Sequence, residues 1–329
     1  MTASIALTGA TTSGHMRPLN ILRDLPGVAD LIELCFAATM DAEGRSYVDQ
    51  MRRNGRDSSF LGWASKVIDS TSLPLSGFIW EDNGRIIGNV SLIPFFKGGR
   101  KIYLIANVAT HPDYRRRGIA RALTEAALGR AREKQASSIW LHVREENKGA
   151  VDLYRNLGFE ERARRTNWLA AAGISSRLDT GPGRIEIQSR PGRDWSAQRQ
   201  WLEQAYPDEI TWYSPKNWDA FQPGLFSSLY RFMADINTLQ WSVYREGVLQ
   251  GVLACQRTYG RPDTLWGAFP ETPDLDAFAA LMFYSRRMLA NSHGVTIEYP
   301  AGIADGAMRA AGFSPQRTLI WMEAPGRSK

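Results

Sequence analysis

A basic segment between a strand and a helix is the part of the sequence best suited to chemistry. The segment VATHPDYRRRGIARAL, residues 108–123, passes from an apolar strand through three consecutive arginines into a helix that starts at Gly-Ile-Ala. The first amides of a helix have no acceptor inside it, and the helix dipole adds about half a positive charge there. Gly118 and Ala120 leave room beside the backbone. The pattern therefore predicts a site for an anion such as a phosphate.

The elements that must position this segment follow a regular order along the first half of the chain. A short strand is expected to end near Leu22, and a helix follows with Pro26 at its start and apolar residues at helical spacing. Asn83-Gly84 between two β-branched and aromatic runs predicts a hairpin. The remaining predicted elements are a helix over 60–68, strands over 101–110, 137–143 and 159–170, and helices over 119–136 and 147–158.

This order, β-α-α-β-β-β-α-β-α-β, is typical of an α/β (α+β) fold with a mixed, partly parallel sheet and helices on both sides. We expect a loose arm over 1–15, a first domain over 16–170, a linker rich in Gly, Ser and Pro over 171–183, and a second domain over 184–329. In the second half, EGVLQGVLAC echoes NGRIIGNVSL, and GFSPQRTLIWMEA echoes GFEERARRTNWLA. The echoes predict two copies of one fold.

Composition removes several classes of function. The chain has 329 residues, a net charge of +6, two cysteines, Cys35 and Cys255, and four histidines without metal-ligand spacing. We therefore expect reduced thiols and no metal site. No apolar run is long enough to span a bilayer and no signal peptide is present, so we expect a soluble, cytoplasmic protein without a membrane partner. The scattered arginines disfavour nucleic acid as a partner. Monomer and homodimer both stay open.

The segment VATHPDYRRRGIARAL, followed by LHVREENKGAVDLYRNLGF, closely resembles the acyl-CoA-binding core of the GNAT N-acetyltransferase superfamily, whose signature is Gln/Arg-x-x-Gly-x-Gly/Ala. The resemblance covers residues 16–170, and for the second half it extends to the fold alone. It implies two tandem GNAT-like domains with acetyl-CoA as cofactor. The cofactor-binding residues that it implies are Val108, Ala109, Thr110, Arg115, Arg116, Arg117, Gly118, Ile119, Ala120, Arg121, Asn147, Ala150 and Tyr154.

The resemblance also implies roles for these residues. The loop amides of residues 115–121 would bind the CoA pyrophosphate, and the backbone of residues 108–110 would bond the pantetheine arm where this strand splays from the next. Asn147 would contact the arm, and Tyr154, seven residues later, projects from the same helix face. Tyr154 would be the general acid that protonates the departing CoA thiolate. The alternative is a core tyrosine that packs against Phe159.

The catalytic base is expected at His142. The ribosomal-protein alanine acetyltransferases, which the first half resembles, often have Leu-Glu-Val-Arg where this chain has Leu-His-Val-Arg at 141–144, and that glutamate is their base. An imidazole with an ordinary pKa of about 6.5 could do the same work. The alternative is a histidine that only fills a strand position. Weaker candidates are Glu81, Glu145 and Asn107 with a bound water.

The second half has lost the anion loop. The segment PETPDLDAFAALM occupies the matching place and contains no Arg-x-x-Gly. Pro270 and Pro273 lack amide donors, while Glu271, Asp274 and Asp276 would repel pyrophosphate. We therefore expect a degenerate second domain that does not bind CoA in the same way. It would pack against the first domain and shape the acceptor cleft.

These inferences converge on an acetyl-CoA-dependent N-acetyltransferase. Its acceptor would be a primary amine of a small molecule or a peptide N-terminus, which attacks the thioester directly, with Tyr154 as acid and His142 as base. Two alternatives keep the CoA site: an acyltransferase that uses a longer acyl-CoA, and a CoA-binding sensor without turnover. A third is a basic nucleic-acid-binding protein, whose binding would depend steeply on salt.

Overall fold

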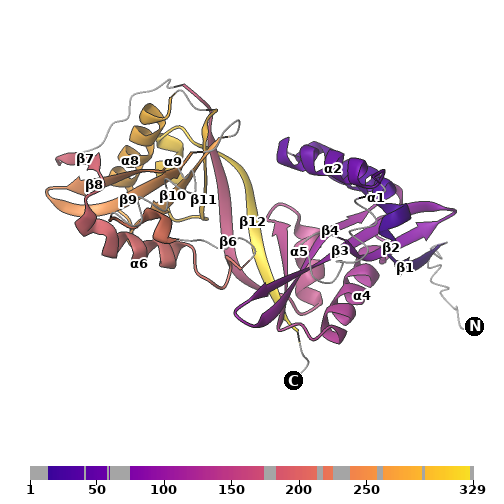
Figure 1. The fold of residues 1–329 in the computed structure, drawn as a ribbon. Helices are drawn as coiled ribbons and strands as arrows, with labels where there is room; N and C mark the ends of the chain where they lie inside the picture. Colours follow the sequence, from indigo (N-terminus) through magenta and orange to yellow (C-terminus); the bar gives the residue numbers. More distant parts are fainter. Residues whose placement is uncertain are drawn as a thin grey trace, which may run out of the picture. The chain divides into compact units, whose positions relative to one another are not determined.

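The structure is a computed structural model that describes residues 14–40, 42–57, 59, 75–173, 183–212, 218–224, 238–257, 262–290 and 293–326. Contacts divide the chain into two units, each drawn from separate stretches of sequence (Figure 1). Unit 1 combines Met1–His142, Gly149–Glu160 and Met322–Lys329, and unit 2 combines Val143–Lys148 with Glu161–Trp321. Residues 1–13 of the expected arm, the expected helix over 60–68 and residues 174–182 of the expected linker lie outside the described residues.

Unit 1 is a mixed sheet with helices packed on it, as the sequence pattern predicts. Its strands are hydrogen-bonded in the order β1-β2-β3-β4-β5, and the end of β12 lies next to β5. The pair β4–β5 is parallel, and the pairs among β1 to β4 are antiparallel. The elements are β1 (His15–Pro18), α1 (Ile21–Phe36), α2 (Ala42–Asn54), β2 (Ser76–Asp82), β3 (Arg85–Lys97), β4 (Arg100–Thr110), α4 (Ile119–Glu133), β5 (Ser138–Arg144), α5 (Lys148–Asn156) and β12 (Ser314–Pro325).

Two local features of unit 1 test the sequence pattern. The Asn83-Gly84 turn is confirmed, because both residues have positive φ, 49° and 76°, as the tight hairpin between β2 and β3 requires. The expected start of the first helix was wrong. The strand ends at Pro18 and α1 begins at Ile21, so Pro26 lies inside the helix. Ile21 and Leu25 pack in the core there, and the Asn20 side chain caps the helix by accepting a hydrogen bond from the Leu22 amide at 3.1 Å.

The core of unit 1 surrounds its central strands. Eight consecutive residues of β3, 87–94, are buried, which requires cover on both faces of the sheet. Helices α1 and α4 both pack against β3 and β4. The closest approach of α4 is at Gly88, where an added side-chain carbon would come within 2.8 Å of Ile119 and 2.9 Å of Leu123. Gly88 therefore sets how closely the start of α4 lies on the sheet.

We expect Gly88→Ala to destabilise unit 1 by about 1–3 kcal/mol, because the new methyl group forces Ile119 and Leu123 away from the sheet. Urea unfolding of the purified chain measures the change. Gly129→Ala is the control in α4, the helix that Gly88 contacts, since an added carbon there meets nothing within 4 Å. That control should gain about 0.5–1 kcal/mol from helix propensity. Equal effects of the two substitutions would contradict the close packing at Gly88.

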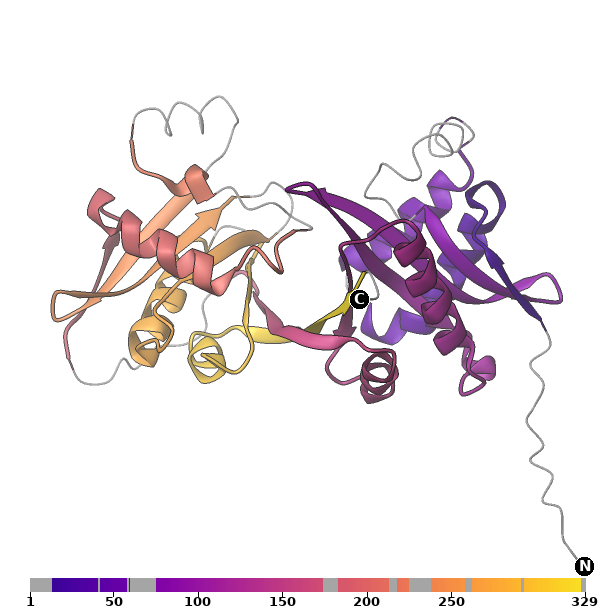
Figure 2. The same ribbon diagram turned by 90° about the horizontal axis from the view of Figure 1, so that it is seen from below.

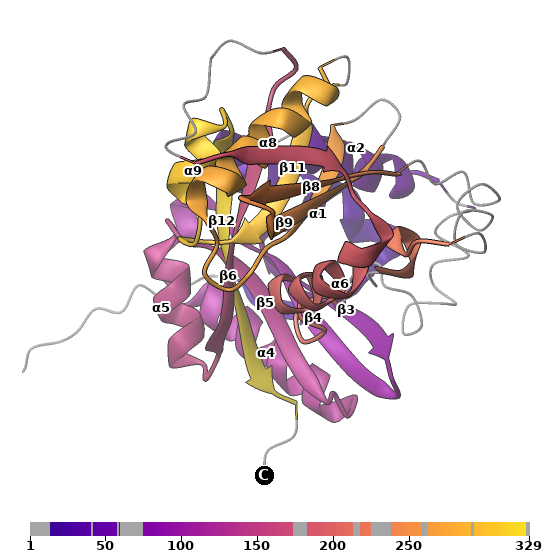
Figure 3. The same cartoon turned by 90° about the vertical axis from the view of Figure 1, so that its left-hand side faces the viewer.

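Unit 2 is also a mixed sheet with helices on both faces. Figure 2 shows α6 lying across its strands, and Figure 3 shows α8 and α9 on the opposite side of β8 and β9 from α6. The strand order is β12-β6-β11-β10-β9-β8-β7, with β10 and β11 parallel. The elements are β6 (Glu160–Ala170), β7 (Ile185–Ser189), α6 (Trp195–Ala205), β8 (Thr238–Arg245), β9 (Val248–Gln256), β10 (Asp263–Ala268), α8 (Leu275–Met288), β11 (Val295–Pro300) and α9 (Asp305–Ala310).

Candidate active site

The two parallel strands of unit 1 separate partway along their length. Their pairing starts at Ile102 with Ser138 and ends at Ile105 with Leu141, although β4 continues to Thr110. The edge of residues 106–110 that faces β5 is therefore outside the parallel ladder. These residues include the expected arm-binding segment 108–110. His142, half-buried, is the first β5 residue beyond the last pair, so it lies at the start of the opening.

A β-bulge lies in β4 at this opening. Asn107 and Val108 together oppose a single β3 residue, Val90, because the register shifts between Asn89 and Ser91. Asn107 adopts the left-handed conformation with φ 52°, which asparagine tolerates better than most residues. A bulge leaves its extra residue outside the ladder and bends the strand. The bulge lies on the part of β4, beyond Ile105, that has no β5 partner in the ladder.

The loop after β4 ends in an uncapped helix start. Arg116 and Gly118 have positive φ, 62° and 81°, and Gly118 occupies the N-cap of α4 without a side-chain cap. The first bond of the helix runs from the Ala122 amide to the Gly118 carbonyl at 3.0 Å, so the amides of residues 119–121 precede it. Nothing lies within 4 Å of the place where a side chain of Gly118 would begin. An anion can therefore reach these amides.

The arginines of the loop are exposed and carry free positive charge. Within the described part of the chain, Arg115, Arg116 and Arg117 form no ion pair with an acidic side chain. Arg115 donates to the Thr110 carbonyl at 3.4 Å, which ties the loop to the end of β4. Arg117 lies 5.0 Å from the centre of the Tyr114 ring. Three uncompensated charges beside the open amides favour a multiply charged anion.

The expected acid, Tyr154, is buried in α5. Only 6% of the residue is exposed, its ring lies edge-on to Phe159 at 6.0 Å, and its hydroxyl has no hydrogen-bond partner among the described residues. Burial raises the pKa of Tyr154, so the hydroxyl keeps its proton at neutral and mildly alkaline pH. Ala150, one turn earlier, is half-buried. Asn147 is exposed just before α5 and falls in unit 2.

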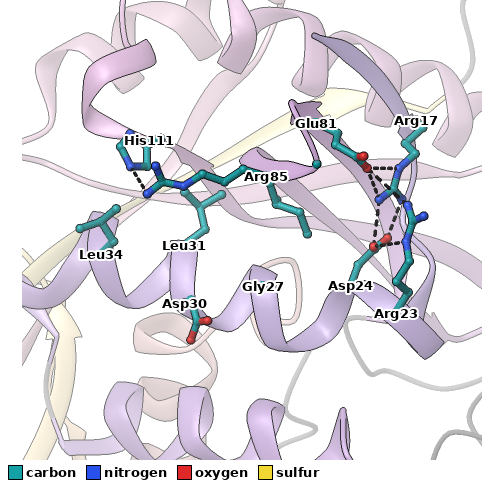
Figure 4. Close-up of a pocket in the computed structure, with 12 residues that line it drawn as sticks. Arg17, Arg23, Asp24, Gly27, Asp30, Leu31, Leu34, Glu81, Arg85 and His111 are labelled. Carbon is teal, nitrogen blue, oxygen red and sulfur yellow. Dashed lines mark hydrogen bonds and ion pairs between the residues drawn. The ribbon is translucent and has the colours of Figure 1, made fainter.

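Of the three weaker base candidates, two are held by arginines. Glu81 forms ion pairs with Arg17 at 2.5 Å and Arg23 at 3.3 Å (Figure 4). It lines a hollow of about 690 Å³ beside α1, and β3 separates its strand from β4. Glu145 is paired with Arg164 in unit 2. The third candidate, Asn107, is the bulge residue and lies at the opening between β4 and β5.

The structure adds a tyrosine that sequence reasoning missed. The Asn107 side-chain amide donates to the Tyr47 hydroxyl at 2.9 Å and to the Ser91 hydroxyl at 3.1 Å. Asn89 donates to the Asn107 carbonyl at 2.9 Å. Tyr47 is on α2, sixty residues before Asn107. The sequence carries no signal for this pair, because neither spacing nor periodicity relates a helix residue to a distant bulge.

The corresponding helix start in unit 2 is closed. Asp274 caps α8 by accepting hydrogen bonds from the amides of Asp276 at 3.1 Å and Ala277 at 3.0 Å. A side-chain carbon on Gly251 would come within 2.3 Å of the Phe269 ring, so this ring fills the space beside the strand. The sequence echo aligns Gly251 with Gly88 of unit 1, which faces α4 instead. The Asp274 carboxylate therefore binds the first amides of α8, whereas the corresponding amides of α4 are open.

Metal binding, membrane insertion and thiol chemistry would each need particular groups in the described ranges. No group of three or more His, Cys, Asp or Glu side chains in them could hold a metal ion. No helix in the same ranges is long and apolar enough to cross a membrane. Cys35 and Cys255 are both free thiols. Cys35 lies 3.3 Å from the Thr110 carbonyl, and burial raises the pKa of its thiol.

Comparison with known proteins places this site in context. The acetyltransferase (GNAT) family model matches residues 37–159. The [ribosomal protein bS18]-alanine N-acetyltransferase of Escherichia coli K12 is 40% identical over 62 residues, which are 19% of this chain and 42% of that protein. An uncharacterised N-acetyltransferase of Methanocaldococcus jannaschii is 35% identical over 95 residues, 28% of this chain and 42% of that protein. The chain thus spans less than half the length of these relatives.

A solved structure extends the similarity to nearly the whole fold. The GCN5-related N-acetyltransferase from Sphaerobacter thermophilus aligns with 96% of this chain and 96% of its own, with a TM-score of 0.52 and 15% identity. At this identity the comparison concerns the fold alone. It agrees with the mixed α/β architecture of both units.

Proposed function

We propose that the chain is an acetyl-CoA-dependent N-acetyltransferase, because residues 37–159 match the model of the acetyltransferase (GNAT) family. Its acceptor is a primary amine of a small molecule or a peptide N-terminus. One observation carries the proposal: the opening between β4 and β5 leads, along residues 106–110, to the uncapped and positively charged start of α4. A long thioester with a diphosphate at its far end matches this combination of strand edge and anion site.

The loop and strand residues bind the donor in this proposal. The amides of residues 119–121 and the side chains of Arg115, Arg116 and Arg117 hold the diphosphate. The backbone of residues 108–110 bonds the pantetheine arm in place of the missing β5 partner. Asn147 and Ala150 contact the same arm from the region of α5. These contacts place the thioester near the bulge.

The chemical step needs little more from the protein. Acetyl-CoA supplies the acetyl group as a thioester. His142 accepts a proton from the amine, directly or through water, because only the neutral amine can attack. A main-chain amide at the Asn107 bulge donates to the carbonyl oxygen as negative charge builds on it. Tyr154 gives its proton to the departing sulfur, and its burial keeps that proton available.

The second half contributes no second donor site in this proposal. Asp274 already occupies the helix amides that a diphosphate would need, and its carboxylate repels an anion. One mole of CoA per mole of chain is therefore expected. The E. coli relative acts on the alanine of a ribosomal protein, which supports a peptide N-terminus among the possible acceptors.

Calorimetry with CoA and a thiol-release assay with a panel of amines test the proposal together. We expect CoA to bind one site per chain and acetyl-CoA to release thiol only when an accepted amine is present. Binding without release for any amine would support a CoA sensor instead. Faster thiol release from a longer acyl-CoA than from acetyl-CoA would identify the longer acyl-CoA as the donor. No CoA binding, with salt-dependent binding to DNA, would overturn the proposal in favour of a nucleic-acid-binding protein.

A further inference from the structure

The Tyr47 hydroxyl lies at the opening but belongs to no role assigned above. Tyr47 is half-buried on α2, and its ring packs against the apolar cluster that includes Val28, Ile32 and Val48. This packing fixes the ring. Its hydroxyl accepts a hydrogen bond from Asn107, which lies two residues beyond the last β4–β5 pair. The side chain therefore reaches from the helix to the bulge where the carbonyl oxygen would be held.

The hydrogen bonds determine where the Tyr47 hydroxyl accepts and where it can donate. A primary amide has two N–H groups, and Asn107 uses its amide nitrogen toward both Tyr47 and Ser91. The Tyr47 oxygen is thus an acceptor toward Asn107, and its own hydrogen has no acceptor among the described residues. Burial raises the pKa of Tyr47 to about 12, so the proton stays on the oxygen during turnover. Tyr47 can offer one hydrogen-bond donor to a ligand.

The surroundings of this donor indicate which group it meets. The four side chains of the cluster, Asn89, Ser91, Asn107 and Tyr47, are all uncharged, and Asn89 and Ser91 are fully buried. A carboxylate would lose its hydration here without gaining a countercharge among these four groups, whereas a neutral carbonyl oxygen would lose much less. A neutral oxygen close to the reacting nitrogen therefore fits best.

We propose that the Tyr47 hydroxyl, aimed by Asn107, donates a hydrogen bond to the carbonyl oxygen beside the acceptor amine, so that the preferred acceptor is an α-amino amide such as a peptide N-terminus. In an α-amino amide this oxygen is separated from the reacting nitrogen by only two carbons. A simple alkylamine has no atom to accept the bond. The inference rests on the N-acetyltransferase function proposed above and narrows its acceptor class.

A matched pair of acceptors tests the inference. Alaninamide and isopropylamine differ in that a carboxamide replaces one methyl group. We expect Tyr47→Phe to lower kcat/KM for alaninamide about tenfold, the usual contribution of one neutral hydrogen bond. It should leave kcat/KM for isopropylamine within about twofold, because that acceptor never used the bond. Comparing variant with wild type for each amine cancels the different basicity of the two acceptors.

Two further variants separate positioning from a structural effect. In Asn107→Gly the Tyr47 hydroxyl loses the amide that aims it, while glycine accepts the φ of 52° at this position, so the same selective loss is expected. The double variant should be no worse than either single one. Tyr103→Phe is the control, since Tyr103 is a buried phenol on the paired part of β4. Tyr103→Phe should leave kcat/KM unchanged for both alaninamide and isopropylamine.

The outcomes distinguish this inference from the proposed function. An equal loss with both acceptors, or no loss with either, overturns the role of Tyr47 while the acetyltransferase stands. A wild-type chain that neither binds CoA nor acetylates either amine refutes the proposed function, and this inference with it. Calorimetric affinity for CoA should be the same in wild type and Tyr47→Phe. A changed affinity would assign the Tyr47 hydroxyl to the donor site and overturn its role toward the acceptor.

Discussion

Replacing Gly118 by aspartate should weaken CoA binding by about 100-fold or more without unfolding the chain. The new carboxylate would place a negative charge beside the open amides at the start of α4. This charge repels a diphosphate and offsets the positive field of the helix start and the loop arginines. Isothermal calorimetry with CoA measures the loss.

Thermal unfolding provides the companion measurement for this variant. The favourable interaction of the carboxylate with the helix dipole should keep the unfolding temperature within about 4 °C of wild type, since it offsets the strain of a side chain at positive φ. Gly98→Asp is the matched control, because Gly98 also has positive φ, 56°, and nothing lies near its missing side chain. The control should bind CoA normally. Undiminished CoA binding by the Gly118 variant would place the diphosphate elsewhere.

Removing the Tyr154 hydroxyl should lower kcat by about 10²–10³-fold, the usual effect of losing a general acid. The KM for acetyl-CoA should change little, because the aromatic ring still packs on Phe159 in Tyr154→Phe. Since burial raises the pKa of Tyr154, the wild-type rate should not fall as pH increases from 7 to 9, where free amine becomes more abundant. Initial rates of thiol release across this range provide the test.

The control for Tyr154 is another buried phenol. Tyr103→Phe removes a hydroxyl from a residue that is 2% exposed, and it should keep the wild-type kcat. A Tyr154→Phe variant with undiminished kcat would assign the proton to water and leave Tyr154 a packing role. Unfolding curves of both variants should match, which excludes loss of folded protein as the cause of a lower rate.

Sequence patterns predicted the features of this protein that depend on neighbouring residues. The Asn83-Gly84 turn, the strand that ends at Thr110 and the helix that begins at Ile119 all appear where the pattern places them. Each depends on local preferences: asparagine and glycine accept positive φ, and Gly118 ends the basic loop as the cap of α4. The order of the predicted strands and helices also indicated the mixed sheet. The residues of the loop and the following helices indicated the family whose model matches residues 37–159.

The start of α1 and the state of Glu81 depended on contacts that the spacing of apolar residues does not show. Apolar spacing places the first helix after Pro26, but Asn20 caps it six residues earlier. Burial of Ile21 and Leu25 in the core, together with the Asn20 cap, offsets the cost of a proline inside the helix. Glu81 likewise looked available as a base, and two arginines hold it. Ion pairs between distant segments leave no trace in residue spacing.

Only the tertiary structure determined which residues lie at the opening between β4 and β5. The bulge at Asn107 exists because β3 and β4 pair in a particular register, and Tyr47 contacts it because α2 packs against α1, which itself lies on β3 and β4. The end of β12 lies next to β5 although about 180 residues separate them in sequence. Helix starts and turns are set by a few adjacent dihedral angles. Strand register and contacts between helix and sheet are set by packing over the whole core, which no short segment encodes.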